Sequence, residues 1–282
     1  MSGQLSDRDH RALVRAFGAL EHPSFAARAS SVLGMPIDQA LRLLPRRWYR
    51  GVRAGAEAAV ERALGVAIRS LGTEPPAGAH ADVHRLLAAG TGAAGGFFGL
   101  PALLLELPVT TVVMLRAVAD IAHSQGEDLA DPAARLACLE VFALGGSAHE
   151  AAYAEIGYYE VRTGLALHFA TVAARVAERG VAAETLPGSV ALVRAVAARF
   201  GVVVSDKAAL QLVPVMGAAA GALVNTVFMR HFQNVAEGHF TVRRLERAYG
   251  SDAVAQAYAD LRNADRAEET RPATSVASQA AS

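Results

Sequence analysis

The sequence predicts an all-α protein, a multi-helix bundle, from three observations. Apolar residues recur with the helical period of 3.6 along most of the 282 residues, and no stretch alternates between apolar and polar residues as a strand would. Hydrophobic residues make up 52% of the chain but aromatic residues only 6%, which predicts thin helices that pack closely. The one cysteine, Cys138, excludes an intrachain disulfide scaffold.

Capping and breaking residues define the expected elements of an N-terminal helical region, residues 1–71. Ser6 is suited to cap an opening helix with its hydroxyl group. Pro36–Leu44 has a proline in its first turn and is expected to be short, and residues 48–70 carry a narrow stripe of small residues typical of close helix contact. The prolines and glycines of residues 72–78 cannot continue a helix, so we expect a linker there.

The following residues, 80–264, are expected to form a helical core. Asp131 and Pro132 are residue types favoured at the N-cap and at the first helical position. We expect a break near Pro101 or Pro108, because proline interrupts helices. The expected helices cover residues 82–105, 109–125, 132–145, 147–179, 187–199, 206–237, 239–249 and 252–263.

A tail follows the core. Residues 265–282 lack large apolar side chains, so they cannot bury enough surface to offset the entropy lost on ordering. We expect this segment to be disordered.

Two segments of the core, residues 86–105 and 208–229, carry no charged residue. Each reaches the roughly 20 residues that a bilayer-spanning helix needs. Their glycine, alanine and proline content equally suits central helices buried in a soluble bundle, which is the interpretation that we favour while both remain open. Glycines spaced for close backbone approach are Gly92, Gly95, Gly96, Gly99, Gly217 and Gly221.

The balance of charge limits the classes of partner. The chain has 27 basic and 27 acidic residues, so it has no overall attraction to a phosphate backbone, and we expect no nucleic-acid partner. The polar N-terminus resembles no signal peptide, which favours a cytoplasmic protein. Contact with a membrane would therefore come from apolar helices or from a protein partner.

Three polar residues share one helical face and form the first candidate site. Glu155, Tyr158 and Arg162 are spaced at i, i+3 and i+7, which brings a carboxylate, a phenol and a guanidinium together. They are expected to act as a polar clasp that holds this helix in the bundle. The alternative is a site in which Arg162 binds an anionic headgroup or a carboxylate while Tyr158 donates a hydrogen bond.

A second candidate set consists of Asn225, His231 and His239. The two histidines are eight residues apart with Gly238 between them, and this spacing does not match a metal-binding helix motif. We therefore expect no metal, and place His239 at a helix N-terminus. The sequence also contains no P-loop, dinucleotide fingerprint or nucleophile elbow, so no cofactor is expected, and Cys138 is interpreted as a small core residue.

Three longer stretches together resemble the EcsC family of bacterial proteins. They are GLPALLLELPVTTVVMLRAVADIAHSQGEDL (99–129), GGSAHEAAYAEIGYYEVR (145–162) and VPVMGAAAGALVNTVFMRHFQNVAEGHFTVRRLERAYG (213–250). The likeness covers about residues 46–250 and leaves the first forty-odd residues and the tail outside.

The resemblance implies a setting rather than a reaction. The family is named after a protein encoded beside the ATPase and membrane subunits of an ABC-type exporter, which implies an accessory role at the inner face of the membrane. Membrane lipid or transporter subunits are then the expected partners. A soluble enzyme with a cleft formed by the two candidate sets stays open as the alternative, as does the oligomeric state.

Overall fold

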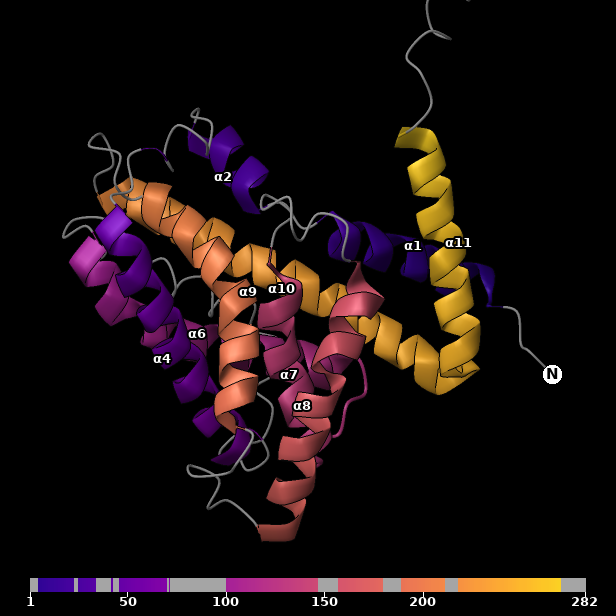
Figure 1. The fold of residues 1–282 in the computed structure, drawn as a ribbon. Coiled ribbons are helices and arrows are strands. Elements are labelled where there is room, and N and C mark those ends of the chain that lie inside the picture. The colour runs from indigo at the N-terminus through magenta and orange to yellow at the C-terminus, as the bar shows by residue number, and fades with distance from the viewer. Residues whose placement is uncertain are drawn as a thin grey trace, which may run out of the picture.

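The structure, a computed structural model, describes residues 5–22, 25–33, 42, 46–69, 71, 100–146, 157–179, 189–210 and 218–269. All regular elements in these residues are α-helices, which confirms the predicted all-α fold (Figure 1). They are α1 (Asp7–Glu21), α2 (Phe25–Leu33), α4 (Arg46–Arg69), α6 (Leu100–Ser124), α7 (Pro132–Leu144), α8 (Tyr158–Arg179), α9 (Ser189–Leu210), α10 (Ala218–Tyr249) and α11 (Ser251–Glu269).

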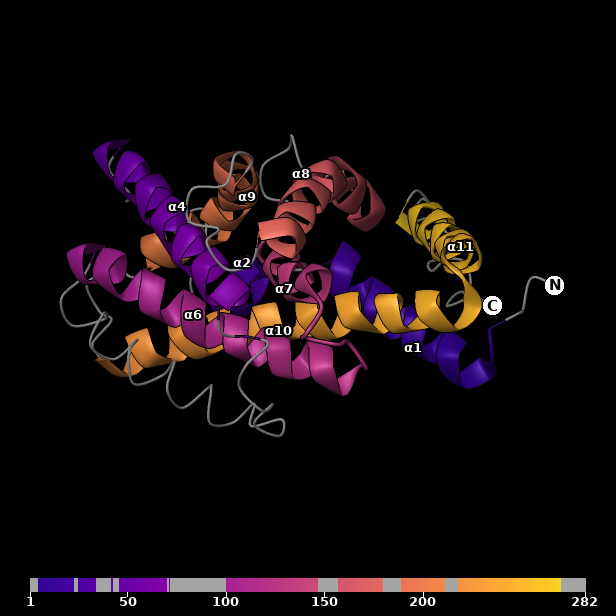
Figure 2. The same ribbon diagram turned by 90° about the horizontal axis from the view of Figure 1, so that it is seen from below.

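Helix α10 is the spine of the bundle. Its 32 residues extend about 48 Å, and it crosses the whole molecule. Helices α1 and α11 pack against its C-terminal half, while α6 lies alongside it, as the view from below shows (Figure 2). On the other side of α6, α4 packs against both α6 and α9. Side chains placed along α10 therefore face different neighbours at different heights.

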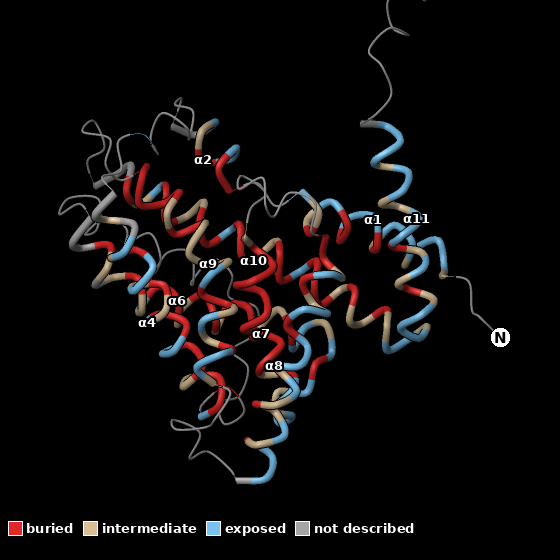
Figure 3. Tube along the Cα trace, in the orientation of Figure 1, coloured by how far each residue is buried: buried red, intermediate tan, exposed pale blue. Residues whose placement is uncertain are grey.

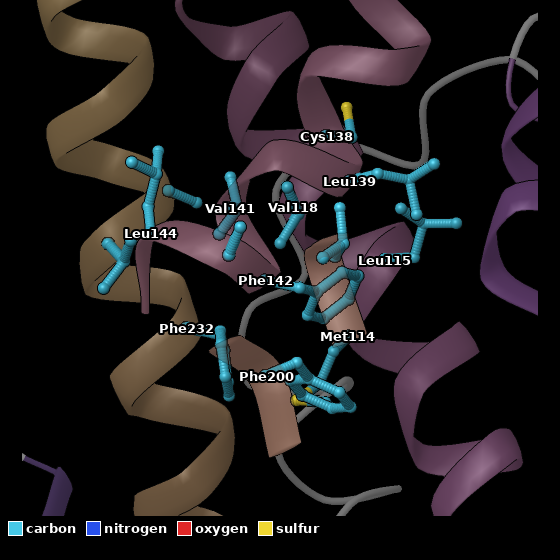
Figure 4. Close-up of a cluster of buried hydrophobic side chains, with 14 of the residues drawn as sticks. Met114, Leu115, Val118, Cys138, Leu139, Val141, Phe142, Leu144, Phe200 and Phe232 are labelled. Carbon is cyan, nitrogen blue, oxygen red and sulfur yellow. The ribbon is translucent and has the colours of Figure 1, made fainter. Parts of the chain in front are cut away.

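A cluster of buried apolar side chains lies where α6, α7, α9 and α10 meet. Burial is concentrated on α7 and the helices around it, whereas much of α11 is exposed (Figure 3). Three aromatic rings, from Phe142, Phe200 and Phe232, contact one another with centroids 5.2–5.5 Å apart (Figure 4). Cys138 is fully buried in the same layer, and burial raises the pKa of its thiol to about 12. It is a core residue, as the sequence indicates.

The two predicted N-caps are confirmed. The Ser6 hydroxyl accepts a hydrogen bond from the backbone N–H of Asp9 at 3.2 Å, and α1 begins at the next residue. The Asp131 carboxylate accepts from the backbone N–H of Ala133 at 2.9 Å, with Pro132 at the first position of α7. Local capping chemistry was therefore a sound guide to these two helix starts.

Of the two positions at which the sequence predicts a break, Pro101 lies in the first turn of α6, which begins at Leu100. The alternative break at Pro108 is wrong, because α6 continues through this residue. A proline inside a helix removes one hydrogen bond and costs about 3 kcal/mol. On either side of it, α6 buries Leu103, Leu107 and Met114 completely. Burying each such side chain contributes about 1.5–3 kcal/mol, so tertiary packing outweighs the cost of the proline.

Two other expected interruptions are also absent from the described residues. Helix α9 continues past Arg199 to Leu210, and α10 continues through Gly238 to Tyr249. Gly238 is buried against α1, where an added Cβ would lie 3.1 Å from the carbonyl oxygen of Ala16. Glycine therefore serves close packing here instead of ending the helix, and His239 lies within α10 rather than at a helix N-terminus.

Several sequence-based expectations concern residues outside the described part. These are most of the short helix 36–44, the linker 72–78, residues 86–99 and 211–217 of the uncharged segments, and Gly92, Gly95, Gly96, Gly99 and Gly217. Helix α11 extends to Glu269, five residues into the segment expected to be disordered, and Asp265 within it is hydrogen-bonded to His22, the residue after α1.

The described ends of the two uncharged segments pack inside the bundle. Leu103 is fully buried at the end of the first segment, and Ala208 and Phe228 are fully buried in the second, where Gly221 is buried too. Among the helices that the structure describes, none combines the length and the apolar character needed to cross a membrane.

Candidate functional site

A buried polar network joins α7, α8 and α10 and contains three of the candidate residues. Tyr158 opens α8, and its hydroxyl group lies 3.0 Å from Nδ1 of His239 on α10. Both side chains are buried, Tyr158 to 3% exposure and His239 to 0%. Arg162, one turn further along α8, places its guanidinium carbon 5.2 Å from the centre of the Tyr158 ring.

Glu140 of α7 extends this arrangement on the other side of the imidazole. Its Oε2 lies 3.6 Å from Nε2 of His239, which is beyond hydrogen-bond distance but close enough for direct electrostatic interaction. A carboxyl group, an imidazole and a phenol thus stand in a row across three helices. A proton can be held between the phenol and the imidazole, which share a hydrogen bond, while the carboxyl group lies just outside hydrogen-bond distance.

Burial is the largest cause of the pKa shifts of Glu140, His239 and Tyr158. Desolvation raises the pKa of Glu140 from 4.5 to about 7, although Arg162 and Arg243 oppose the change. The pKa of His239 is lowered well below its usual value, first by burial and then by the same two arginines. Burial also raises the pKa of the Tyr158 hydroxyl group well above its usual value. Near pH 6, therefore, all three groups are mainly uncharged.

Arg162 is held by a carboxylate on α10. Its two terminal nitrogens donate to Oε1 and Oε2 of Glu246 at 2.8 and 3.2 Å, and the Tyr159 hydroxyl group donates to Oε1 at 2.9 Å. Burial alone would lower the pKa of Arg162, but the nearby Tyr158 and Glu246 raise it above its ordinary value. A bidentate pair of this kind fixes the rotation of α8 against α10.

A second carboxylate pairs with the C-terminal half of α10. Glu127, in the turn after α6, accepts hydrogen bonds from Arg243 at 2.9 and 3.0 Å and also from Arg247. Burial would raise the pKa of Glu127, but the two guanidinium groups lower it below its usual value. Arg243, which is partly buried, and Arg247, which is exposed, thus share one carboxylate partner within the chain.

Asn225 lies in a separate polar cluster near the other end of α10. Its Oδ1 accepts a hydrogen bond from Nζ of Lys207 at 2.7 Å, and the same ammonium group lies 3.3 Å from Oε1 of Glu106 and 4.8 Å from the centre of the Phe228 ring. Thr110 donates to the same glutamate oxygen at 3.0 Å. Lys207 is completely buried, and desolvation lowers its pKa despite the opposing charge of Glu106.

His231 occupies a third environment. Its Nε2 lies 2.8 Å from the carbonyl oxygen of Gly145, and because a carbonyl can only accept, Nε2–H must donate. Burial lowers the pKa of His231 to about 4, with a further lowering from Arg28. A neutral imidazole that ties α10 to the end of α7 is a structural role.

The structure therefore brings together only part of the sequence-predicted set. Tyr158, Arg162 and His239 meet, whereas Asn225 lies 14 residues from His239 along one helix, about 21 Å away. Glu155 lies outside the described residues. A single cleft that uses both histidines and Asn225 is incompatible with this placement.

Four carboxylates that sequence analysis did not select are central to these clusters: Glu106, Glu127, Glu140 and Glu246. Glu140 and Glu106 had a usable signal, because each is a single acidic residue within an apolar helical run. A charged residue on a face that must be buried has to find a partner. Lys207, the chain's only lysine, offered the same signal.

No cluster of three or more potential metal-ligating side chains occurs among the described residues. Two cavities open between the described helices, and both are lined by residues outside the polar clusters. One of about 360 Å³ lies between α1, α2 and α10. The other, of about 660 Å³, lies between α4, α6 and α9.

Comparison with known proteins gives one match. The family model described as the EcsC protein family matches residues 58–245, which is most of the chain and runs from α4 to near the end of α10. No curated protein and no solved structure was found to match.

Proposed function

Because the chain belongs to the EcsC protein family, we propose that it is a non-enzymatic accessory protein. In this proposal it associates with the cytoplasmic face of the membrane or with subunits of an ABC-type transporter. Support comes from the exporter setting after which the family is named and from the arrangement of charged and apolar side chains in the helical core.

One observation carries the proposal: charged side chains of the core form ion pairs within the bundle, while several large apolar side chains are exposed on its surface. Arg162, Arg243 and Lys207 each have a carboxylate partner within the bundle. In contrast, Leu167 on α8 is 75% exposed and Val109 on α6 is 51% exposed. Burying each of these against a lipid or protein surface would contribute about 1.5–3 kcal/mol.

The balance of charge is consistent with such an attachment. With equal numbers of acidic and basic residues, long-range attraction to anionic lipid is weak, so contact would rest mainly on apolar burial. Binding of this kind is expected to persist when salt screens surface charges.

Fractionation of cells that produce the full chain tests the proposal. The protein should sediment with membranes and stay there through a high-salt wash. Leu167→Asp together with Val109→Asp should release it, because each places a charge at an apolar contact. Ala166→Asp, at the neighbouring exposed position of α8, supplies the matched control and should remain bound. Complete recovery of the wild type in the soluble fraction would remove the proposal.

The second candidate, a soluble enzyme, is favoured by the row formed by Glu140, His239 and Tyr158. An acid, an imidazole and a phenol in contact are suited to general acid–base catalysis if a substrate reaches them. Treatment of the folded protein with diethyl pyrocarbonate distinguishes the two candidates. Modification of His239 would favour the enzyme, whereas modification of the exposed His22 with His239 protected would favour the accessory role.

A further inference from the structure

The larger cavity, between α4, α6 and α9, has the size of a ligand site. Its volume of about 660 Å³ lies within the range of roughly 300–1,000 Å³ that is usual for pockets holding small molecules. None of the polar clusters described above contributes to its lining. The cavity is therefore a separate feature of the family-matched core.

One part of the wall of this cleft is apolar, and the cleft is partly open to solvent. Leu64 and Ile68 of α4 line it and are buried, and Val190 of α9 lines it while being 59% exposed. Pro108 of α6 also lines the cleft, and the next residue, Val109, is 51% exposed. Two of the most exposed large apolar side chains in the described residues thus lie in the cleft or beside it.

The rim of the cleft carries more positive than negative charge. Arg62 and Arg69 of α4 and Arg194 of α9 are three cationic lining residues. Glu57 and Glu61 are the acidic ones, and Glu57 is paired with Arg53, outside the cleft, at 3.6 Å. Among the charged residues of the lining, arginines therefore outnumber glutamates by one, and one of the two glutamates is already paired.

Two of these arginines have no acidic partner in the described part of the chain. No ion pair within the placed helices includes Arg62 or Arg194, and both side chains are exposed. Gly65 adds local room, since a Cβ there would lie 2.8 Å from a terminal nitrogen of Arg69. The absence of a side chain lets this guanidinium group fold back over α4.

From these observations we propose that the cleft binds an anionic amphiphile, with one alkyl chain along the α4–α9 wall and the headgroup at Arg62 and Arg194. This inference rests on the proposed membrane association and identifies the lipid chemistry that the protein recognises. A guanidinium group pairs well with a phosphate or carboxylate oxygen, and the apolar wall removes the attached chain from water. A free anion would contact only Arg62 and Arg194, and an uncharged amphiphile would contact only the apolar wall.

Calorimetric titration of the full chain tests the proposal, with dodecyl phosphate kept below its critical micelle concentration. Saturable binding at a one-to-one ratio is expected, with inorganic phosphate and dodecyl maltoside at least about tenfold weaker. Arg62→Ser combined with Arg194→Ser should weaken binding of dodecyl phosphate by about tenfold or more. Arg8→Ser combined with Arg11→Ser, on exposed positions of α1, removes the same charges elsewhere and should leave binding unchanged.

A fluorescent label in the cleft shows whether dodecyl phosphate binds there. Cys138 is fully buried, so the variant Val190→Cys can be labelled selectively with a polarity-sensitive fluorophore. Dodecyl phosphate should shift the emission of this label to the blue. A label that does not respond while dodecyl phosphate binds would overturn the proposal, since the ligand would then bind outside the cleft. The proposal would also be overturned if the double variant Arg62→Ser, Arg194→Ser (the cleft double variant) bound dodecyl phosphate as tightly as the wild type does. The same holds if the wild type bound dodecyl maltoside as tightly as dodecyl phosphate.

Vesicle binding separates this inference from the function on which it rests. If the wild type sediments with membranes but binds dodecyl phosphate no more tightly than the Arg62→Ser, Arg194→Ser double variant does, the cleft proposal fails and the accessory role stands. If the wild type binds dodecyl phosphate but never sediments with membranes, the accessory role at a membrane fails while the ligand site is retained.

Discussion

Replacing Glu140 by glutamine should make the protein more stable above neutral pH. Burial raises the pKa of this carboxyl group from 4.5 to about 7, so the folded state favours its protonated form. Its stabilising contribution is fully present below pH 4.5 and is lost as the pH rises to about 7. Relative to an unshifted carboxyl group, the raised pKa of Glu140 lowers the free energy of unfolding by about 1 kcal/mol at pH 5 and about 3 kcal/mol at pH 8.

Glutamine has nearly the same shape but does not ionise. The free energy of unfolding of Glu140→Gln, relative to the wild type, should therefore rise by about 2 kcal/mol between pH 5 and pH 8. His239 titrates in both proteins, and its contribution largely cancels in this difference. Its lowered pKa alone predicts a loss of stability as the pH falls below 6.5 in each protein.

Urea unfolding followed by circular dichroism at several pH values measures the effect. Glu268→Gln, at an exposed position of α11, is the matched control and should follow the wild-type profile. Parallel pH profiles for Glu140→Gln and the wild type would refute the reasoning, because Glu140 would then be as well solvated in the folded state as in the unfolded chain.

Three further substitutions test the packing and the ion pairs. Gly145→Ala should lower the free energy of unfolding by about 1–3 kcal/mol, because the new Cβ would lie 2.5 Å from Cε1 of Phe232; an unchanged urea midpoint would contradict this packing. Lys207→Met should cost about 3–5 kcal/mol by leaving Glu106 buried without its cation, and adding Glu106→Gln should recover most of that loss in the same assay. Arg162→Ala should lower the melting temperature and leave membrane sedimentation unchanged, whereas loss of sedimentation with an intact fold would favour an anion site at this residue.

The sequence predicts the start of a helix correctly where a capping residue lies next to it. Ser6 and Asp131 carry the chemistry of an N-cap within a few residues, so the starts of α1 and α7 could be found without tertiary information. Pro108 and Gly238 also have strong local signals, but those signals were misleading. In both cases contacts with distant helices outweigh the preference of the residue, and such contacts are not readable from a local window.

In the candidate site, too, neighbours along one helix could be predicted from the sequence, whereas contacts between helices could not. The spacing of Tyr158 and Arg162 correctly places them on adjacent turns of one helix, α8. Their partners, Glu246 and His239, lie more than 70 residues away, so only the assembled bundle could identify them. The separation of Asn225 from His239 follows from α10 being a single helix, which an incorrect break at Gly238 had concealed.

Flotation of the full chain with phospholipid vesicles tests most directly whether apolar surfaces attach this protein to a membrane. The arrangement of paired inner charges and exposed apolar side chains predicts that the protein floats with the vesicles at about 0.05 M salt and equally at about 0.5 M salt. A protein that stays at the bottom of the gradient under both conditions would contradict membrane attachment. Release at the higher concentration alone would contradict an apolar origin for it.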